Sequence, residues 1–160
     1  MAFRRLEDRV DVGSKAPDFT LRSQSGANVS LRDFLGRSPI VLFFYPKDDT
    51  PGCTKQACAF RDDYGQFGAV DAEVFGISSD SVGSHKNFAE NNELPFALLS
   101  DEGGKVSQLY GVPKTLGLMP GRVTYVIDKE GVVRRIFSSQ LAVSRHVEEA
   151  LAALATIDDH

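Results

Sequence analysis

The chain has 160 residues, of which 42% are hydrophobic and 25% charged, and its formal net charge is −4. These values are typical of a soluble globular protein that can bury a substantial core within one domain. They exclude the strongly basic surface of proteins that bind nucleic acids or anionic membranes, and no apolar run approaches the roughly 20 residues of a membrane-spanning helix.

The first residues are polar, and Met1–Asp11 is expected to fray. Met1–Val10 carries three arginines but no apolar run, so it does not resemble a secretory signal, and it is short for an organelle transit peptide. The chain has only two cysteines, too few for the disulfide framework of a small secreted protein. We therefore expect a reducing compartment and cysteines that take part in chemistry.

The next segments predict a hairpin and then a buried strand. Apolar and polar residues alternate on both sides of Ser25-Gly26, which is typical of two antiparallel strands. A short turn at Asp33–Gly36 follows. Pro39–Tyr45 is an apolar run rich in β-branched and aromatic residues, as in a central strand that is buried on both faces.

A helix is predicted directly after this strand, because apolar residues recur at helical spacing between Ala57 and Phe67. Thr50 suits the N-cap, and Pro51 suits the first helical position. Cys53 then lies in the first turn, where the positive potential of a helix N-terminus favours the nucleophilic thiolate. The alternative is that Cys53 is only a small buried core residue.

The second cysteine, Cys58, follows five residues later. On an ideal helix the two Cα atoms are roughly 8.7 Å apart, beyond the limit of roughly 7 Å for a disulfide. Cys53 lies on the inward face with Ala57, whereas Cys58 lies on the polar side. A disulfide between them therefore requires the first helical turns to unwind. The spacing also differs from the C-x-x-C of a thioredoxin-type dithiol.

Strands and helices alternate through the rest of the chain. Strands are expected at Glu73–Ser78 and Ala97–Ser100, a hairpin at Arg122–Asp128 and Val132–Phe137, an irregular segment at Val112–Gly121, and helices from Asp80 or Ser81 to about Asn91, from Asp101–Gly104 to Tyr110, and from Val143 to Leu154. This order predicts an α/β fold with a mixed β-sheet flanked by helices and an N-terminal β-hairpin. One domain is expected over residues 1–160, with its core at about 12–155.

The cysteine segment resembles a known family. P-K-D-D-T-P-G-C, which ends at Cys53, resembles the P-x-x-x-T-x-x-C signature of peroxiredoxins, and T-K-Q-A-C-A-F-R-D resembles their Q subfamily, also called the bacterioferritin comigratory protein group. The resemblance runs from about Val12 to Leu154 and includes A-P-D-F-T-L, L-P-F-A-L-L-S-D-E-G and L-M-P-G-R-V-T-Y-V-I-D. It implies a thioredoxin-like fold, with which the order of elements agrees.

The resemblance also implies roles for both cysteines. Cys53 is the expected peroxidatic cysteine, whose thiolate attacks hydrogen peroxide or an organic hydroperoxide and becomes a sulfenic acid. Cys58, the only other thiol, is the expected resolving cysteine that forms an intramolecular disulfide. Thioredoxin or glutaredoxin is the expected external reductant. The alternative for Cys58 is a thiol on the helix surface without a role.

Three further residues complete the expected site. Thr50 is expected to cap the helix and to direct its hydroxyl at the peroxide, or else to serve as a cap alone. Pro46 is expected to shape the loop and shield the thiolate, although a proline that ends a strand needs no function. Arg122 is expected to stabilise the thiolate and hold the peroxide oxygens through its fork of donors; the alternative is a solvated arginine at a strand end.

No cofactor or metal is expected. His85 and His146 fall on predicted helix surfaces without a second plausible ligand nearby in the sequence, so both are expected to be solvated. The two cysteines also lack the paired spacing of a zinc site.

The sequence thus favours a thioredoxin-dependent thiol peroxidase. A peroxide sensor or thiol–disulfide relay, which passes oxidation to a partner, is the alternative and uses the same residues. A non-catalytic thioredoxin-fold interaction module has no need of them. The resemblance favours a monomer in the bacterial cytoplasm, and a plastid after removal of a transit peptide is the alternative location.

Overall fold

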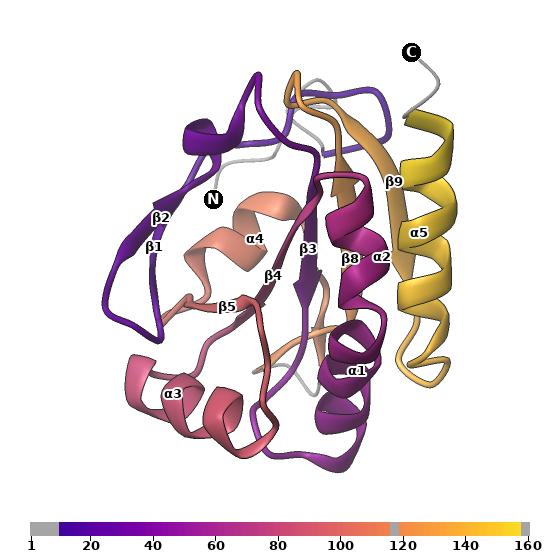
Figure 1. Cartoon of the computed structure of the whole chain (residues 1–160). Helices are drawn as coiled ribbons and strands as arrows, with labels where there is room; N and C mark the ends of the chain where they lie inside the picture. The colour runs from indigo at the N-terminus through magenta and orange to yellow at the C-terminus, as the bar shows by residue number, and fades with distance from the viewer. Residues whose placement is uncertain (1–9, 116–118, 158–160) are drawn as a thin grey trace.

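A seven-stranded mixed sheet lies at the centre of the computed structural model, which describes residues 10–115 and 119–157 (Figure 1). The sheet has the strand order β2-β1-β5-β4-β3-β8-β9. Its strands are β1 (Thr20–Ser23), β2 (Asn28–Ser30), β3 (Ile40–Phe44), β4 (Glu73–Ser78), β5 (Ala97–Ser100), β8 (Val123–Ile127) and β9 (Val133–Ser138). The helices are α1 (Pro51–Asp62), α2 (Tyr64–Ala69), α3 (Val82–Asn91), α4 (Lys105–Tyr110) and α5 (Arg145–Ile157), with a 3-10 helix at Leu31–Phe34. The predicted α/β class and N-terminal hairpin are confirmed.

Strand β3 is the central strand, as its composition predicts. It pairs in parallel with β4 and antiparallel with β8, and all five of its residues are buried. Because side chains alternate along a strand, Val41 and Phe43 enter the core on one face of the sheet, while Leu42 and Phe44 enter the core on the other.

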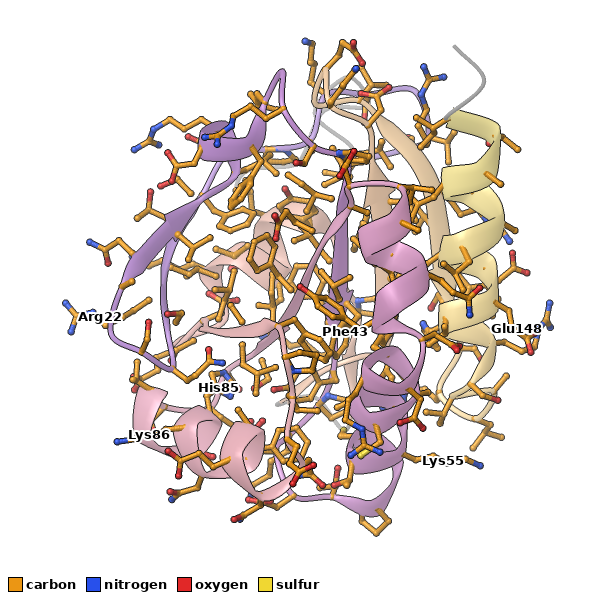
Figure 2. The ribbon with its side chains drawn as sticks, in the orientation of Figure 1. Arg22, Phe43, Lys55, His85, Lys86 and Glu148 are labelled. Carbon is orange, nitrogen blue, oxygen red and sulfur yellow. The ribbon has the colours of Figure 1, made fainter. Side chains whose placement is uncertain are left out.

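Helices cover both faces of the sheet. The core that contains Phe43 is closed by α1, α2, α3 and α5, and α4 packs on the opposite face (Figure 1). Figure 2 shows Phe43 near the middle of the molecule, and its ring stacks on that of Phe60 from α1 with a centroid distance of 4.4 Å. This stack fixes the inward face of α1 against the sheet. None of the helices among the described residues combines the length and apolarity needed to cross a bilayer.

The strand register brings three segments together at one end of the inner strands β3, β4 and β8. Phe44, the last residue of β3, pairs with Ile77 of β4 and with Val123, the first residue of β8. Residues 45–50 and 79–81 therefore leave the sheet at the end where Arg122 precedes β8. The carboxyl ends of parallel strands are the usual place for a site in such sheets.

Two expectations need correction. The helical pattern from Ala57 to Phe67 belongs to two helices, since α1 ends at Asp62 and α2 begins at Tyr64. The pattern continues across the break because Phe60 and Phe67 face the same core. The segment predicted to be irregular contains a short ladder between β6 (Lys114–Thr115) and β7 (Met119–Pro120).

Candidate active site

Cys53 is the third residue of α1 and is 1% exposed. Thr50 is the N-cap residue and Pro51 the first helical residue, as the sequence predicts. Backbone N–H groups in this first turn have no partner within the helix. The Cys53 sulfur thus lies at the positive end of α1, in a buried position rather than on an open surface.

Arg122 brings a cation to this sulfur from the start of β8. Its side chain is buried, and Nη1 lies 3.5 Å from Cys53 Sγ. The same Nη1 donates to Gln56 Oε1 at 2.7 Å. The predicted proximity of Arg122 and Cys53 is therefore present, although the two residues are far apart in the sequence.

Gln56 is a member of the site that the sequence interpretation missed. It is fully buried one helical turn after Cys53, and it fixes the guanidinium from the side of α1. Its Nε2 and the Nε of Arg122 are buried without a hydrogen-bond partner among the described residues. The i, i+3 spacing from Cys53 was the available signal, because residues so spaced share a helix face.

Gly52 leaves the space that the guanidinium occupies. A Cβ atom built on Gly52 would lie 3.1 Å from Arg122 Nη2, which is tighter than ordinary van der Waals contact. The glycine therefore permits close approach of Arg122 to the first turn of α1.

The loop between β3 and α1 carries Pro46 and Thr50, and both are half-buried. The predicted capping bond from the Thr50 side chain is absent. Instead the Thr50 hydroxyl donates to the carbonyl oxygen of Lys47 at 3.0 Å and closes the loop on itself. Because its hydrogen is engaged there, Thr50 Oγ1 has lone pairs that can accept a hydrogen bond.

Cys58 lies apart from this group. Both cysteines are free thiols within α1, and Cys58 is half-buried. Its sulfur faces Asn92 Oδ1 at 3.8 Å, at the C-terminal end of α3. The prediction placed Cys53 on the inward face and Cys58 on the polar side; in the structure Cys53 is buried, and Cys58 is half-buried on a different side of α1.

The predictions for the two histidines were wrong, because both are fully buried. His85 projects inward from α3, whereas its neighbour Lys86 points outward (Figure 2). Its Nδ1 lies 2.7 Å from Asp48 Oδ2, and Asp48 follows β3 in the same loop as Thr50. The spacing of His85 and Phe88, three residues apart on one helix face, was the missed signal.

His146 lies on the inward face of α5. Its Nε2 lies 2.9 Å from the Ser139 carbonyl oxygen, so Nε2 carries the hydrogen, and Nδ1 accepts from the Thr124 hydroxyl at 2.7 Å. Burial lowers the pKa of His146, and the nearby Arg122 charge lowers it further. The side chain is therefore a neutral imidazole packed beside the arginine of the site.

Comparisons with known proteins identify the family. A match to the AhpC/TSA family covers residues 12–136. A chloroplastic peroxiredoxin Q of Oryza sativa subsp. japonica is 55% identical over 150 residues, which are 93% of this chain and 69% of the relative. The chain belongs to the AhpC/TSA family, as a peroxiredoxin of the Q group.

Solved structures agree with this identification. Peroxidoxin BcpB from Mycobacterium tuberculosis has a TM-score of 0.86 at 40% identity, and the match covers 93% of this peroxiredoxin and 99% of that chain. A bacterioferritin comigratory protein from Xanthomonas campestris, described for its alkyl peroxide reduction, has a TM-score of 0.80 at 29% identity, over 88% and 92% of the two chains. The thioredoxin-like fold is confirmed, and this peroxiredoxin is a thiol peroxidase.

Proposed function

We propose that Cys53 is the peroxidatic cysteine of this enzyme. The observation that carries the proposal is the 3.5 Å contact between Arg122 Nη1 and Cys53 Sγ at the first turn of α1. A fixed cation and a helix N-terminus both favour the thiolate, the form that attacks peroxide.

The surrounding groups suit a hydroperoxide. Donors from Arg122 and from the backbone of the first turn bind the peroxide oxygens, and Thr50 Oγ1 accepts the O–H of the substrate. Pro46 closes the loop side of the site against water. The thiolate sulfur bonds to the terminal peroxide oxygen, the O–O bond breaks, and the leaving oxygen takes a proton to depart as water or alcohol. Cys53 is oxidised to the sulfenic acid.

Cys58 then resolves this intermediate. Its thiol attacks the Cys53 sulfenic acid, a disulfide forms and water leaves. No third cysteine exists in the sequence, so an external dithiol must reduce the bond. We propose thioredoxin as this donor, with glutaredoxin as the alternative. No cofactor or metal enters any step.

A coupled assay tests this function. NADPH, thioredoxin reductase and thioredoxin are supplied with hydrogen peroxide or with a bulky organic hydroperoxide, and NADPH oxidation is followed. Cys53→Ser should abolish turnover, because no other residue forms the sulfenic acid. Cys58→Ser should react once and accumulate a trappable sulfenic acid at Cys53. Undiminished steady turnover in Cys53→Ser would contradict the assignment. A stable mixed disulfide with one client, without turnover, would support the sensor or relay instead.

The protein is proposed to act as a monomer of one domain in a reducing compartment. The bacterial cytoplasm remains the predicted location, and the chloroplastic names of the plant relatives support the plastid alternative. Sedimentation of the reduced and oxidised forms tests the monomer.

A further inference from the structure

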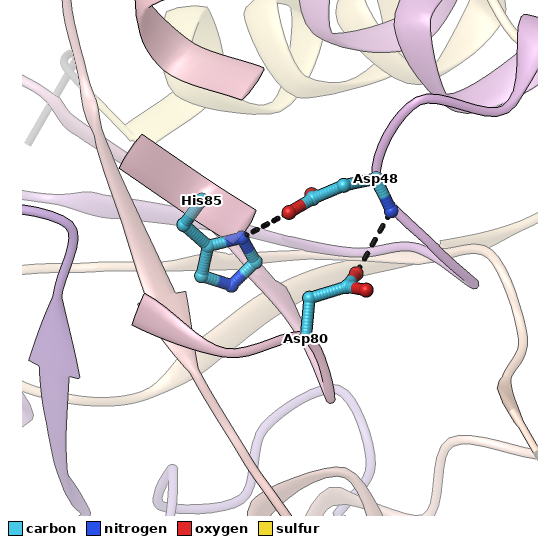
Figure 3. A group of neighbouring side chains, drawn as sticks. All are labelled: Asp48, Asp80 and His85. Atoms are coloured by element: carbon cyan, nitrogen blue, oxygen red, sulfur yellow. Dashed lines mark hydrogen bonds and ion pairs between the residues drawn. The ribbon is translucent and has the colours of Figure 1, made fainter. Parts of the chain in front are cut away.

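A buried network of titratable side chains anchors the loop that carries Pro46 and Thr50. Asp48 in this loop and His85 on α3 are 4% and 0% exposed (Figure 3). The Asp48 carboxylate accepts from the Tyr45 hydroxyl at 2.6 Å and from the Ser84 hydroxyl at 2.8 Å. Burial, and then the neighbouring Asp48 carboxylate, raise the pKa of Tyr45, so that its hydroxyl remains a hydrogen-bond donor.

The groups that face the two His85 ring nitrogens determine how many protons Asp48 and His85 hold together. Its Nε2 lies 3.1 Å from the carbonyl oxygen of Leu99, which can only accept, so Nε2 carries a hydrogen. Its Nδ1 faces Asp48 Oδ2 at 2.7 Å. The Tyr45 hydroxyl lies farther from Nδ1, at 3.4 Å, and donates its hydrogen to Asp48 Oδ1 at 2.6 Å instead. Without a hydrogen between them, two lone pairs would face each other in a buried site, at a high cost in free energy. One further proton therefore lies between Asp48 and His85.

The second buried histidine shows the contrast. His146 faces one carbonyl oxygen and one hydroxyl, and the hydroxyl supplies the hydrogen that its Nδ1 accepts. A neutral ring satisfies that site, whereas the nearest neighbours of the two His85 nitrogens are the Leu99 carbonyl oxygen and the Asp48 carboxylate, and neither brings a hydroxyl hydrogen.

The backbone of the same loop needs this anchor. Asp49 has a φ of 64°, a left-handed conformation that residues other than glycine adopt at a cost. The Asp48 N–H donates to Asp80 Oδ2 at 2.8 Å (Figure 3), and Asp80 also accepts from the Ser78 hydroxyl. The loop is thus tied to the end of β4 through its backbone and to α3 through the Asp48 side chain.

These contacts also account for the grouping of Asp48, Asp80 and His85, whose ligand-type atoms lie within 4.8 Å of one another. The contacting oxygens and nitrogens already bond to protein groups. The grouping needs no ion to explain it.

We propose that Asp48 and His85, joined by a shared proton, are positioning residues for the peroxide reaction. They hold the loop so that Pro46, Thr50 and the first turn of α1 surround Cys53. They act through the loop backbone and not by contact with the peroxide. The proposal rests on the proposed role of Cys53.

Two substitutions of Asp48 distinguish the hydrogen bond between Asp48 and His85 from the charge of the carboxylate. In Asp48→Asn the amide oxygen accepts from Tyr45, one amide hydrogen occupies the position of the shared proton, and the Ser84 hydroxyl turns to accept the other. The anchor is kept without a carboxylate. In Asp48→Ala it is lost. Misplacement of catalytic groups by about 1 Å can slow a reaction by up to about a hundredfold.

The rate constant for Cys53 oxidation by hydrogen peroxide is measured in single turnover, in the Cys58→Ser background, by quenched flow and mass spectrometry of the trapped sulfenic acid. We expect Asp48→Ala to be slower by about ten- to a hundredfold, and Asp48→Asn to stay within about threefold of the background protein. Asp128→Ala is the matched control, because Asp128 is a buried aspartate at the other end of β8 from Arg122, where it binds Arg134 and two backbone N–H groups. It should lose stability in urea and keep the rate.

Each other outcome overturns the proposal. An unchanged rate in Asp48→Ala would contradict the positioning role. Equal slowing in Asp128→Ala would mean that general destabilisation explains the slower rate. Equal slowing in Asp48→Asn and Asp48→Ala would contradict the role given to the shared proton. If Asp48→Ala does not fold, nitrogen-15 NMR of His85 in the unsubstituted protein decides, because a ring without hydrogen on Nε2 contradicts the proton count. Failure of Cys53 to oxidise in the background protein would instead overturn the proposed function.

Discussion

Arg122 is a buried cation held between a thiol and an amide. Its Nη1 contacts Cys53 Sγ and Gln56 Oε1, while Gly52 leaves room for Nη2. A hydrogen bond to a charged group is worth about 1.5–3 kcal/mol. Loss of the guanidinium removes both its charge and its donors from the place where the peroxide must bind.

We therefore expect Arg122→Ala to slow Cys53 oxidation by about ten- to a hundredfold, the rate equivalent of that energy. Arg122→Lys should recover only part, because an ammonium keeps the charge but lacks the planar fork. Rapid mixing with hydrogen peroxide, quenching at set times and titration of the remaining thiol measure this rate. Arg134→Ala is the control, since that arginine pairs with Asp128 at the other end of β8. A wild-type rate in Arg122→Ala would remove Arg122 from the site.

His146 gives a prediction about acid stability. Because burial lowers its pKa in the folded protein, the unfolded chain binds a proton at His146 at higher pH than the folded protein does. Its contribution to stability is complete above the ordinary histidine pKa of 6.5 and is lost progressively as the pH falls below it. The free energy of unfolding of the wild type should therefore decrease more between about pH 7.5 and pH 5.5 than that of His146→Gln. Urea titrations measure both, and parallel pH profiles would contradict a buried neutral His146.

The two cysteines of α1 require two incompatible conformations of that helix. As a folded helix it holds Cys53 and Gln56 against Arg122 and places Cys58 beside Asn92. Positions five apart on an ideal helix have Cα atoms roughly 8.7 Å apart, too far for a disulfide. The catalytic helix and the disulfide therefore cannot coexist.

Oxidation should consequently unfold the segment from about Thr50 to Ala59. The first turn contains Gly52, which has a low helix propensity, and helix ends fray most readily. Unfolding also carries the disulfide outward to where a reductant can reach it. Amide hydrogen exchange should show lost protection mainly in this segment of the oxidised protein. Equal protection in both forms, with the bond between Cys53 and Cys58 confirmed by mass spectrometry, would contradict this description of α1.

Across the fold, the sequence predicts those elements whose residue pattern has a local cause. Strand β3 is recognisable because all five of its residues are buried, and α5 because its buried residues repeat at helical spacing. The break between α1 and α2 leaves the apolar spacing intact, so periodicity alone does not reveal it. The short β6–β7 ladder has too few residues to give any pattern.

The candidate site follows from the sequence only in part. The segment around Cys53 is continuous, but Arg122 reaches it through the register that pairs Phe44 with Val123, which no local pattern shows. Arg122 was assigned to the Cys53 site through the resemblance to peroxiredoxins. Gln56 and His85 were missed because a polar residue on a helix is normally assigned to solvent. Their burial depends on partners in other elements, Arg122 for one and Asp48 for the other.

The same coupling of α1 to the sheet predicts how oxidation changes the stability of the whole protein. A disulfide that closes a loop of about six residues stabilises by only about 2 kcal/mol in the chain-entropy description. Forming it separates Gln56 and Cys53 from Arg122, and leaving a buried charge without its partner costs on the order of 3–5 kcal/mol. The net effect should be destabilising, in contrast to most native disulfides.

We therefore expect the disulfide form to melt at least about 3 °C below the reduced form. Calorimetry of protein oxidised with one equivalent of hydrogen peroxide, compared with protein kept under a thiol reductant, measures the shift. Cys58→Ser treated in the same way is the control, because its Cys53 can be oxidised but cannot form the bond within α1. A melting temperature that is unchanged or higher in the disulfide form would mean that Arg122 finds new partners after oxidation, and that α1 contributes less to the folded state than its contacts indicate.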